Sequence, residues 1–217
     1  MIYVYHALNT RPRSWSQVAQ VLQENAPALL AKRGGHLHGL FRNQIGRPRD
    51  EVSAITAWPD EHNYDAERDW FACAAPDILS VDSRPMVPTL RPTQLASPSR
   101  QGNFAFRWFE TPEQNYAEFL QLCEAAWPDF ESSYDSQVLG LWRFDNTPAE
   151  AAGTIHTLLL TRRPNLAMWE RSKIPTGEVE VALRQKLTRR YELCDATSVF
   201  TTTLITASDE VDTVRWT

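Results

Sequence analysis

The chain has 217 residues, of which 42% are hydrophobic and 23% charged, and its formal net charge at pH 7 is -5. This composition is typical of a soluble globular protein with one large domain or two small ones. No cluster of Lys and Arg marks a nucleic-acid-binding protein, and no apolar run approaches the roughly 20 residues that span a bilayer. We therefore expect neither nucleic acid nor a membrane as a partner.

The cysteines and the first residues bear on the cellular location. Cys73, Cys123 and Cys194 form neither a CxxC pair nor a disulfide framework, and MIYVYHALNT lacks the basic and cleavage regions of a signal peptide. A reduced, cytoplasmic protein is the expectation.

A seven-residue pattern occurs twice, as HLHGLFR at residues 36–42 and as QVLGLWR at residues 137–143. A shift of 101 residues aligns Gly39 with Gly140, and the register holds without a gap from residue 3 to residue 42. The apolar positions coincide along the whole aligned stretch. Self-similarity of this kind predicts a tandem duplication.

The first half predicts the order βαββαβ, which is that of a ferredoxin-like unit. Alternating aromatic and β-branched residues predict the strands, and apolar residues at helical spacing predict the helices. The expected strands are residues 2–8, 36–44, 52–58 and 85–90, and the expected helices are residues 14–33 and 61–75. Pro27 should kink or split the first helix.

The second half predicts the same order, with a longer second helical region. The expected strands are residues 103–110, 136–144, 154–161 and 199–205, and the expected helical regions are residues 115–133 and 174–193. A stretch rich in Pro, Ser and Gly separates the halves. We therefore divide the chain into a first repeat at 1–92, a linker at 93–102 and a second repeat at 103–217.

A ferredoxin-like sheet carries helices on one face only, so its other face needs a cover. The second unit of the same chain can supply that cover, as a partner chain does in a dimer. The predicted fold class is α+β, a tandem duplication of a ferredoxin-like βαββαβ unit that forms a pseudo-dimeric α/β barrel. Further pairing into a homodimer of pseudo-dimers stays open.

Three stretches carry a resemblance to a known family: YVYHALNT at 3–10, LLAKRGGHLHGLFRNQIG at 29–46 and AITAWPDEHNYDAERDW at 54–70. They resemble the dimeric α+β barrel superfamily and, within it, NIPSNAP-type domains. The positions that match the family pattern are Gly39, Phe41, Gly46, Trp58 and Arg68, with Gly140, Trp142 and Arg171 in the second half. The hairpin Gly is replaced in the second half by DNTPAEAAG, which departs from the pattern.

The resemblance implies several activities. Some members of the superfamily are cofactor-free monooxygenases or cyclase-like enzymes that act on aromatic or polyketide compounds. Others, the chlorite dismutase-like and dye-decolourising peroxidase-like branches, bind haem between helices and sheet. Others have no established activity, and the fold alone does not select among them. No tightly bound cofactor is expected, with haem as the alternative.

His156 lies in TIHTLLL, an otherwise apolar strand. A buried imidazole needs a hydrogen-bond partner or a ligand. His156 is therefore a candidate general base or haem axial ligand. The alternative is a core histidine that a neighbouring side chain satisfies.

Arg107 aligns with His6, and each lies between aromatic residues in a first strand. First and third strands are neighbours in a ferredoxin-like sheet, so Arg107 is expected near His156. There it would stabilise an oxyanion or bind a carboxylate. The alternative is an ion pair at the rim of a strand. In the first half, His6 and His38 are the alternative candidates for catalytic residues.

His36 and His38 stand two residues apart, so a regular strand would place them on one side, in a polar row with Arg42. Two imidazoles there would bind a metal or transfer protons. The alternative is a strand end near solvent. No acidic or Cys partner stands at a recognisable metal spacing, so we predict no metal site.

Aromatic residues supply candidate walls for a substrate pocket. Tyr5, Phe106, Trp108 and Trp142 are the residues that we expect to line it, although bulky core residues look the same in sequence. The function favoured by the sequence is an enzyme for a small hydrophobic or aromatic substrate, bound between sheet and helices, preferably in the second half. The alternatives are a haem protein with His156 as axial ligand and a non-catalytic interaction module with a filled interior.

Overall fold

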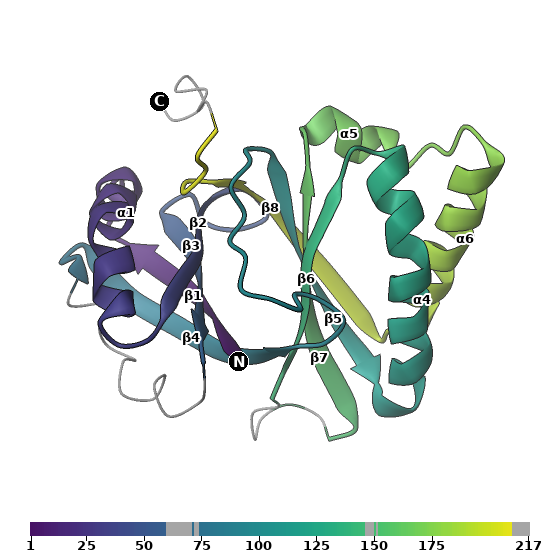
Figure 1. Ribbon diagram of the computed structural model, residues 1–217, viewed down its shortest axis with the longest axis horizontal. Coiled ribbons are helices and arrows are strands. Elements are labelled where there is room, and N and C mark those ends of the chain that lie inside the picture. The colour runs from purple at the N-terminus through teal and green to yellow at the C-terminus, as the bar shows by residue number, and fades with distance from the viewer. Residues whose placement is uncertain (60–70, 72–73, 146–149, 151, 210–217) are drawn as a thin grey trace. The chain divides into compact units, whose positions relative to one another are not determined.

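The computed structural model describes residues 1–59, 71, 74–145, 150 and 152–209. It divides into two compact units. The first consists of Met1–Val87, Gln94–Gln101 and the residues from Thr201 onwards, and the second of Pro88–Thr93 and Gly102–Phe200 (Figure 1).

The first unit is a ferredoxin-like sheet with helix α1 on one face. Its elements are β1 Ile2–Thr10, α1 Trp15–Ala31, β2 His36–Ile45, β3 Glu51–Trp58 and β4 Ile78–Pro88. The strands are antiparallel in the order β4-β1-β3-β2. Val4, Leu8 and Ala54 on the sheet join Val18 and Leu22 of α1 in one apolar core. The helix expected at 61–75 falls largely outside the described residues.

The second unit repeats this plan with more helix. Its elements are β5 Asn103–Pro112, α4 Glu113–Ser133, β6 Gln137–Phe144, β7 Thr154–Arg163, α5 Leu166–Arg171, α6 Glu178–Glu192 and β8 Ala196–Leu204, whose residues from Thr201 onwards are counted with the first unit. The strand order is β8-β5-β7-β6. Helices α4 and α6 lie side by side over one face of the sheet (Figure 1), joined by ion pairs of Arg189 with Glu118 at 2.7 Å and of Lys186 with Asp129 at 3.3 Å.

The repeated cassette encodes a local distortion of the second strand in each unit. The strand register shifts between Leu37 and Gly39 in β2 and between Val138 and Gly140 in β6, as at a β-bulge. A Cβ atom on Gly39 would lie 2.8 Å from the Phe41 ring, and one on Gly140 would overlap the Trp142 ring. The aromatic residue therefore packs over the bare backbone of the glycine, which explains why the cassette needs both.

The predicted fold class, α+β with ferredoxin-like units of the pseudo-dimeric α/β barrel type, is confirmed by the strand order of both units. Three details differ from the prediction. Strand β4 begins at Ile78, earlier than predicted. The prediction missed its first part because the polar residues Ser80, Asp82 and Ser83 interrupt the apolar strand pattern. Helix α1 is not split at Pro27 and is one helix from Trp15 to Ala31. Helix α5 was not predicted.

None of the helices among the described residues is long and apolar enough to cross a membrane.

Candidate functional site

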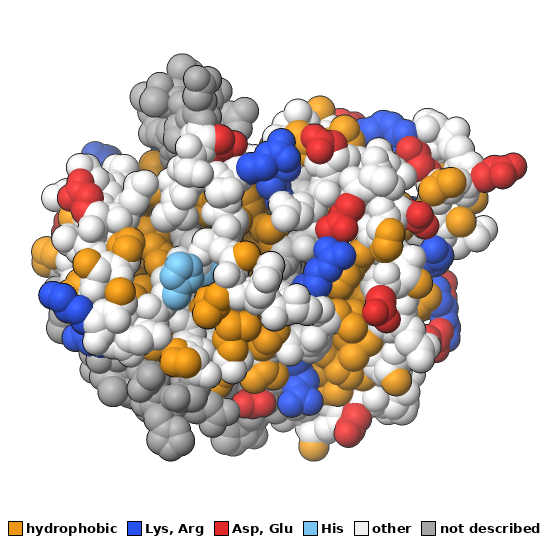
Figure 2. All heavy atoms as spheres, in the orientation of Figure 1, with side chains coloured by type: hydrophobic (Ala, Val, Ile, Leu, Met, Phe, Trp, Pro, Cys, Tyr) orange, Lys and Arg blue, Asp and Glu red, His pale blue; other side chains and the backbone are white. Residues whose placement is uncertain are grey.

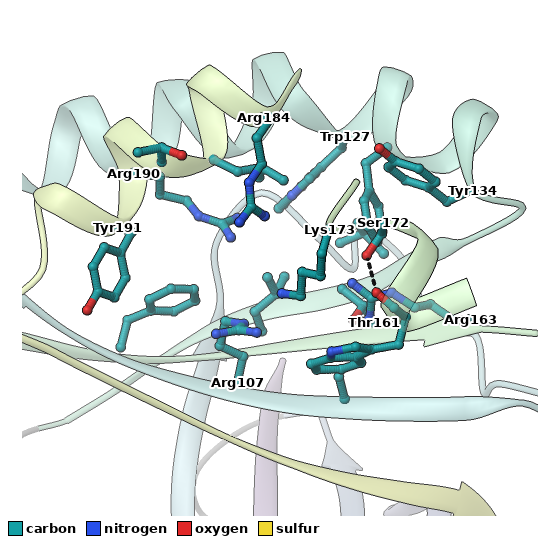
Figure 3. A pocket seen from close by; sticks show the side chains of 18 residues that line it. Arg107, Trp127, Tyr134, Thr161, Arg163, Ser172, Lys173, Arg184, Arg190 and Tyr191 are labelled. Carbon is teal, nitrogen blue, oxygen red and sulfur yellow. Dashed lines mark hydrogen bonds between the residues drawn. The ribbon is translucent and has the colours of Figure 1, made fainter. Parts of the chain in front are cut away.

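The second unit holds a cavity of about 390 Å³ between its sheet and helices α4, α5 and α6 (Figure 3). This volume lies within the usual range for small-molecule sites. The sheet contributes Ala105, Arg107 and Phe109 of β5, Val138 of β6, and Leu159, Thr161 and Arg163 of β7. On β5 and β7 these are alternate residues, so they leave one face of the sheet.

The helices close the other side of the cavity. Trp127, Phe130 and Tyr134 of α4, Trp169 of α5, Ser172 and Lys173 after it, and Arg184, Leu187, Thr188, Arg190 and Tyr191 of α6 line it. Six aromatic side chains therefore stand around the space, which suits a flat hydrophobic ligand.

Short-range hydrogen bonds hold the segment between α5 and α6 in place. Asn165 caps α5 by accepting a hydrogen bond from the Met168 N–H at 2.9 Å. Arg171 pairs with Glu180 at 2.6 Å, and the same carboxylate accepts from the Thr176 N–H at 2.8 Å. These bonds fix both ends of the segment that carries Lys173 into the cavity.

The charge of the cavity is one-sided. Five basic residues line it, namely Arg107, Arg163, Lys173, Arg184 and Arg190, while no Asp or Glu stands among its described lining residues. On the outside of the same unit, over α4 and α6, Figure 2 shows acidic and basic side chains interspersed. Because buried cations need counter-charges, the cavity is suited to an anion.

Three of these cations surround Trp169. The Arg163 guanidinium carbon lies 4.4 Å from the centre of the indole, Lys173 Nζ 5.3 Å and the Arg107 guanidinium carbon 5.9 Å. Arg163 also stands 5.0 Å from the Phe130 ring and donates from Nη1 to Thr161 Oγ1 at 3.2 Å. Cation–π contacts orient these groups without neutralising them.

Arg190 forms the other end of the basic lining. Its guanidinium carbon lies 5.0 Å from the centre of the Phe109 ring, and its Nη1 lies 3.6 Å from Cys123 Sγ. Burial raises the pKa of the Cys123 thiol, so the thiol is a poor counter-ion for the guanidinium.

The pKa values record this crowding of like charges. Burial, then Arg190 and Arg184, lower the pKa of Arg107 to about 10. Burial and Arg107 lower the pKa of Arg163 to about 10. Burial and the three arginines Arg107, Arg184 and Arg163 lower the pKa of Lys173 to about 8. Lys173 is therefore partly neutral near physiological pH and can accept a proton.

The structure does not bring Arg107 and His156 together. Arg107 is paired with Leu159 in the sheet and His156 with Glu110, three residues further along. Because successive side chains alternate, Arg107 points into the cavity and His156 leaves the opposite face. His156 Nδ1 lies 3.7 Å from Glu150 Oε1. The expected proximity of the two residues is wrong, because the odd separation between His156 and Leu159, the partner of Arg107, places them on opposite faces of the sheet.

The aromatic side chains that we expected to line the pocket in the second half also project from the sheet face opposite the cavity. Trp108 is paired with Leu158, Phe106 with Leu160 and Trp142 with Leu158, all on the face away from the cavity. Trp108 stacks on Phe144 at 4.8 Å between ring centroids. None of the three lines the cavity.

His6 and Tyr5 lie in the sheet of the first unit. His6 is buried between Ser83 Oγ at 2.7 Å and Thr56 Oγ1 at 2.9 Å, and burial lowers its pKa to about 3. The Tyr5 hydroxyl lies 3.4 Å from Ser53 Oγ, and burial raises its pKa. Both side chains are thus satisfied within the core.

His38 does not form the expected polar row with Arg42. The bulge at residues 37–39 interrupts the alternation, and the buried His38 packs edge-on against Tyr3 at 5.3 Å. Arg42 stacks over the Trp15 ring at 4.2 Å on the helix side of the sheet. Burial lowers the pKa of His38 to about 3, so it is neutral at physiological pH.

Of the predicted site residues, Arg107 alone is among the described lining residues of the cavity. Sequence reasoning missed Arg163, Lys173 and Arg190. For Arg163 one signal was available, because it stands four residues after Leu159, the partner of Arg107, and alternation places it on the same face of the sheet. Lys173 had none, since it lies on a segment whose path the sequence pattern does not predict.

The cavity does not fit a haem held by His156. Haem iron is held by His, Cys, Met or Tyr, and the described lining contains Tyr134 and Tyr191 but no His, Cys or Met. His156 leaves the other face of the sheet.

No protein-family model matches the sequence, and no curated protein matches it. Solved structures do match. A candidate monooxygenase from Lactobacillus acidophilus has a TM-score of 0.61 at 10% identity, covering 97% of this chain and 99% of its own. An anthrone oxidase-like protein has a TM-score of 0.56 at 10% identity, covering 97% and 96%. A mutant chlorite dismutase from Candidatus Nitrospira defluvii, in complex with cyanide, has a TM-score of 0.57 at 9% identity, covering 94% and 90%. At these identities the likeness shows a shared fold.

Proposed function

We propose that the chain is an enzyme for a small aromatic anion, or for an aromatic compound that becomes an anion during the reaction, and that it works without a tightly bound organic cofactor. The observation that carries the proposal is the cavity of about 390 Å³ with its basic, aromatic lining and no carboxylate among its described residues. Such a site stabilises negative charge on a flat hydrophobic frame.

Lys173 is the base in this proposal, in place of His156. Its pKa, lowered to about 8, leaves a useful fraction of neutral amine at neutral to mildly alkaline pH. Arg107 stands near Lys173 in the middle of the cavity (Figure 3) and would hold the oxyanion that forms. The roles suggested for His156, His38 and His6 then have no part in the reaction.

The reaction begins with removal of a proton from an acidic C–H or O–H group of the aromatic substrate, which leaves an enolate or phenolate. In an isomerase-like reaction the anion takes a proton back at another position. In a monooxygenase-like reaction it is oxidised by O₂. For anthrone, one oxygen atom enters the product anthraquinone and the other leaves in water. The monooxygenase and anthrone oxidase-like neighbours favour this second form.

The proposal includes a relationship to NIPSNAP-type domains, which rests on the sequence motifs around Gly39 and Trp58. A homodimer of pseudo-dimers and a cytoplasmic location are proposed alongside it. Light scattering on the purified protein tests the first of these two, since a dimer would double the chain mass of 24.8 kDa.

Anthrone is a suitable first substrate because its C–H acidity matches the proposed step. Exchange of its acidic hydrogens in D₂O, followed by NMR without O₂, measures proton removal alone, and O₂ uptake measures oxidation. Lys173→Met should abolish the enzyme-dependent part of both signals. Lys186→Met, which removes an ion pair with Asp129 outside the cavity, is the matched control. Exchange that persists in Lys173→Met would refute the assignment of the base.

A haemin titration separates the proposal from the haem alternative. Purified protein without a Soret band, and without a saturable shift on addition of haemin, is expected. A saturable Soret band would instead indicate a haem protein whose haem is bound at a site other than the one predicted at His156.

A further inference from the structure

We propose that the cavity of the second unit selects a rigid aromatic ligand with two acidic groups, one held by Arg163 and the other by Arg190. The inference rests on the proposed function, because it specifies the ligand class of the same cavity. It adds two specificity-determining residues at the ends of the site.

Arg163 is a built anion site rather than a surface charge. Its side chain is 7% exposed, and it lines the cavity. Nη1 donates to Thr161 Oγ1, while Nε has no hydrogen-bond partner among the described residues. A buried guanidinium with a vacant donor and aromatic neighbours lacks its counter-charge. A ligand carboxylate can accept two parallel hydrogen bonds from such a group.

Arg190 has the same properties on the helix side. Its side chain is 8% exposed and lines the cavity, and Nε has no hydrogen-bond partner among the described residues. Its closest polar contact is the Cys123 thiol. The exposed neighbour Arg189, by contrast, is paired with Glu118 and does not line the cavity.

The two arginines belong to different ends of the cavity. In the β5–β7 ladder Arg163 is paired with Asn103, whereas Arg190 stands over Phe109, six residues along β5. Six residues of strand correspond to about 20 Å, and the long arginine side chains shorten the gap between the guanidinium groups. Arg107 lies between the two ends, since it stands on β5 between Asn103, the partner of Arg163, and Phe109.

Between the ends, apolar and aromatic side chains such as Leu159 and Trp127 line the cavity beside Arg107. One carboxylate could satisfy one of the two buried guanidinium groups and would leave the other without a counter-ion. A second acidic group at the far end of a rigid aromatic frame satisfies both, with little loss of conformational freedom on binding.

Calorimetric titration of the intact protein at pH 7 tests the inference with matched pairs of probes. The diacids are terephthalate, naphthalene-2,6-dicarboxylate and biphenyl-4,4′-dicarboxylate, which differ in length, and each is compared with its monocarboxylate. We expect one diacid to bind at least about tenfold more tightly than its monoacid, as one added charge-assisted hydrogen-bonded pair predicts.

Arg163→Gln and Arg190→Gln should each reduce that diacid to the affinity of its monoacid. Arg189→Gln should leave the difference intact. Preference for a diacid that survives in both cavity variants would overturn the assignment of these arginines. The comparison of diacid with monoacid uses the unaltered protein, so it decides the question even where a variant fails to fold.

The same titrations separate failure of this inference from failure of the proposed function. Diacids that bind no more tightly than monoacids, while monoacids bind and anthrone exchanges its hydrogens, would overturn the two-acid inference alone. Absence of binding by every aromatic acid, together with absence of exchange, would overturn both.

Discussion

The Arg163 guanidinium stands 4.4 Å from the centre of the Trp169 indole, and Lys173 Nζ stands 5.3 Å from the same centre. One indole from α5 thus contacts a cation of the sheet and a cation of the segment that follows the helix. This contact aligns two charges that no carboxylate of the described cavity lining neutralises, and it gives α5 a part in the site.

Trp169→Leu should weaken binding of an aromatic carboxylate such as 2-naphthoate by about tenfold, since it removes cation–π contacts of about 0.5–1 kcal/mol each and one aromatic wall. Titration calorimetry measures the change. Trp108→Leu, on the opposite face of the sheet, is the control and should keep the affinity of the unaltered protein. Equal losses in the two variants would mean that Trp169 acts only through stability.

The pH dependence of kcat/KM should report Lys173. Because burial and three arginines lower its pKa to about 8, the neutral base accumulates as the pH rises, and the rate should increase through about pH 8 and then level off. The profile can be measured with anthrone between pH 6 and 9.5, after subtraction of the uncatalysed reaction. A rate that falls over this range would contradict a lysine base.

Binding of an aromatic carboxylate should draw a proton from solution near pH 8.5. An anion beside Lys173 favours its charged form and raises its pKa above the value of about 8 in the free protein. Calorimetry in buffers of different ionisation enthalpy counts the protons taken up. Lys173→Met should bind without this uptake, whereas Lys186→Met should retain it.

His6 should make the first unit acid-sensitive. Burial lowers its pKa to about 3 in the folded protein, against about 6.5 in the unfolded chain. Its contribution to the free energy of unfolding is therefore complete above pH 6.5 and is lost as the pH falls towards 3. His6→Gln should show a shallower decline, by about 1.4 kcal/mol per pH unit. Denaturant titrations from pH 7 to pH 4 test this, and parallel curves would refute it.

Gly140→Ala should destabilise the protein by about 1–3 kcal/mol, the usual cost of overpacking, because the new methyl group would overlap the Trp142 ring. Gly177→Ala is the control, since a Cβ atom there meets nothing within 4 Å and an N-cap change of this kind costs about 1 kcal/mol or less. Urea denaturation compares the two. Equal stabilities would show that Trp142 moves aside freely.

The sequence predicted the fold more fully than the site. The alternation in β1, the helical spacing in α1 and the repeated glycine–aromatic cassette are local signals, and they suffice for the ferredoxin-like order. Strand β4 was recognised only from residue 85, because its polar residues at 80–84 interrupt the apolar pattern.

The site depends on which face of a strand a residue occupies and on an irregular segment. Arg107 could be singled out because an arginine between aromatic residues is unusual. His156 was a candidate because it interrupts an apolar strand, yet it stands on the sheet face opposite the cavity. Lys173 and Trp169 enter the cavity through α5 and the turn after it, where hydrogen bonds of Arg171 and Glu180 set the path. No periodic pattern encodes such a path.

The measurement that tests the central claim most directly compares 2-naphthoate with the neutral 2-naphthalenemethanol by titration calorimetry at low and high salt. The account predicts saturable binding of the carboxylate, at least about tenfold tighter than that of the alcohol, weakened by salt and by Arg107→Gln. Equal affinities for the two compounds, unchanged by salt and by the substitution, would contradict the claim that the basic cavity of the second unit recognises aromatic anions.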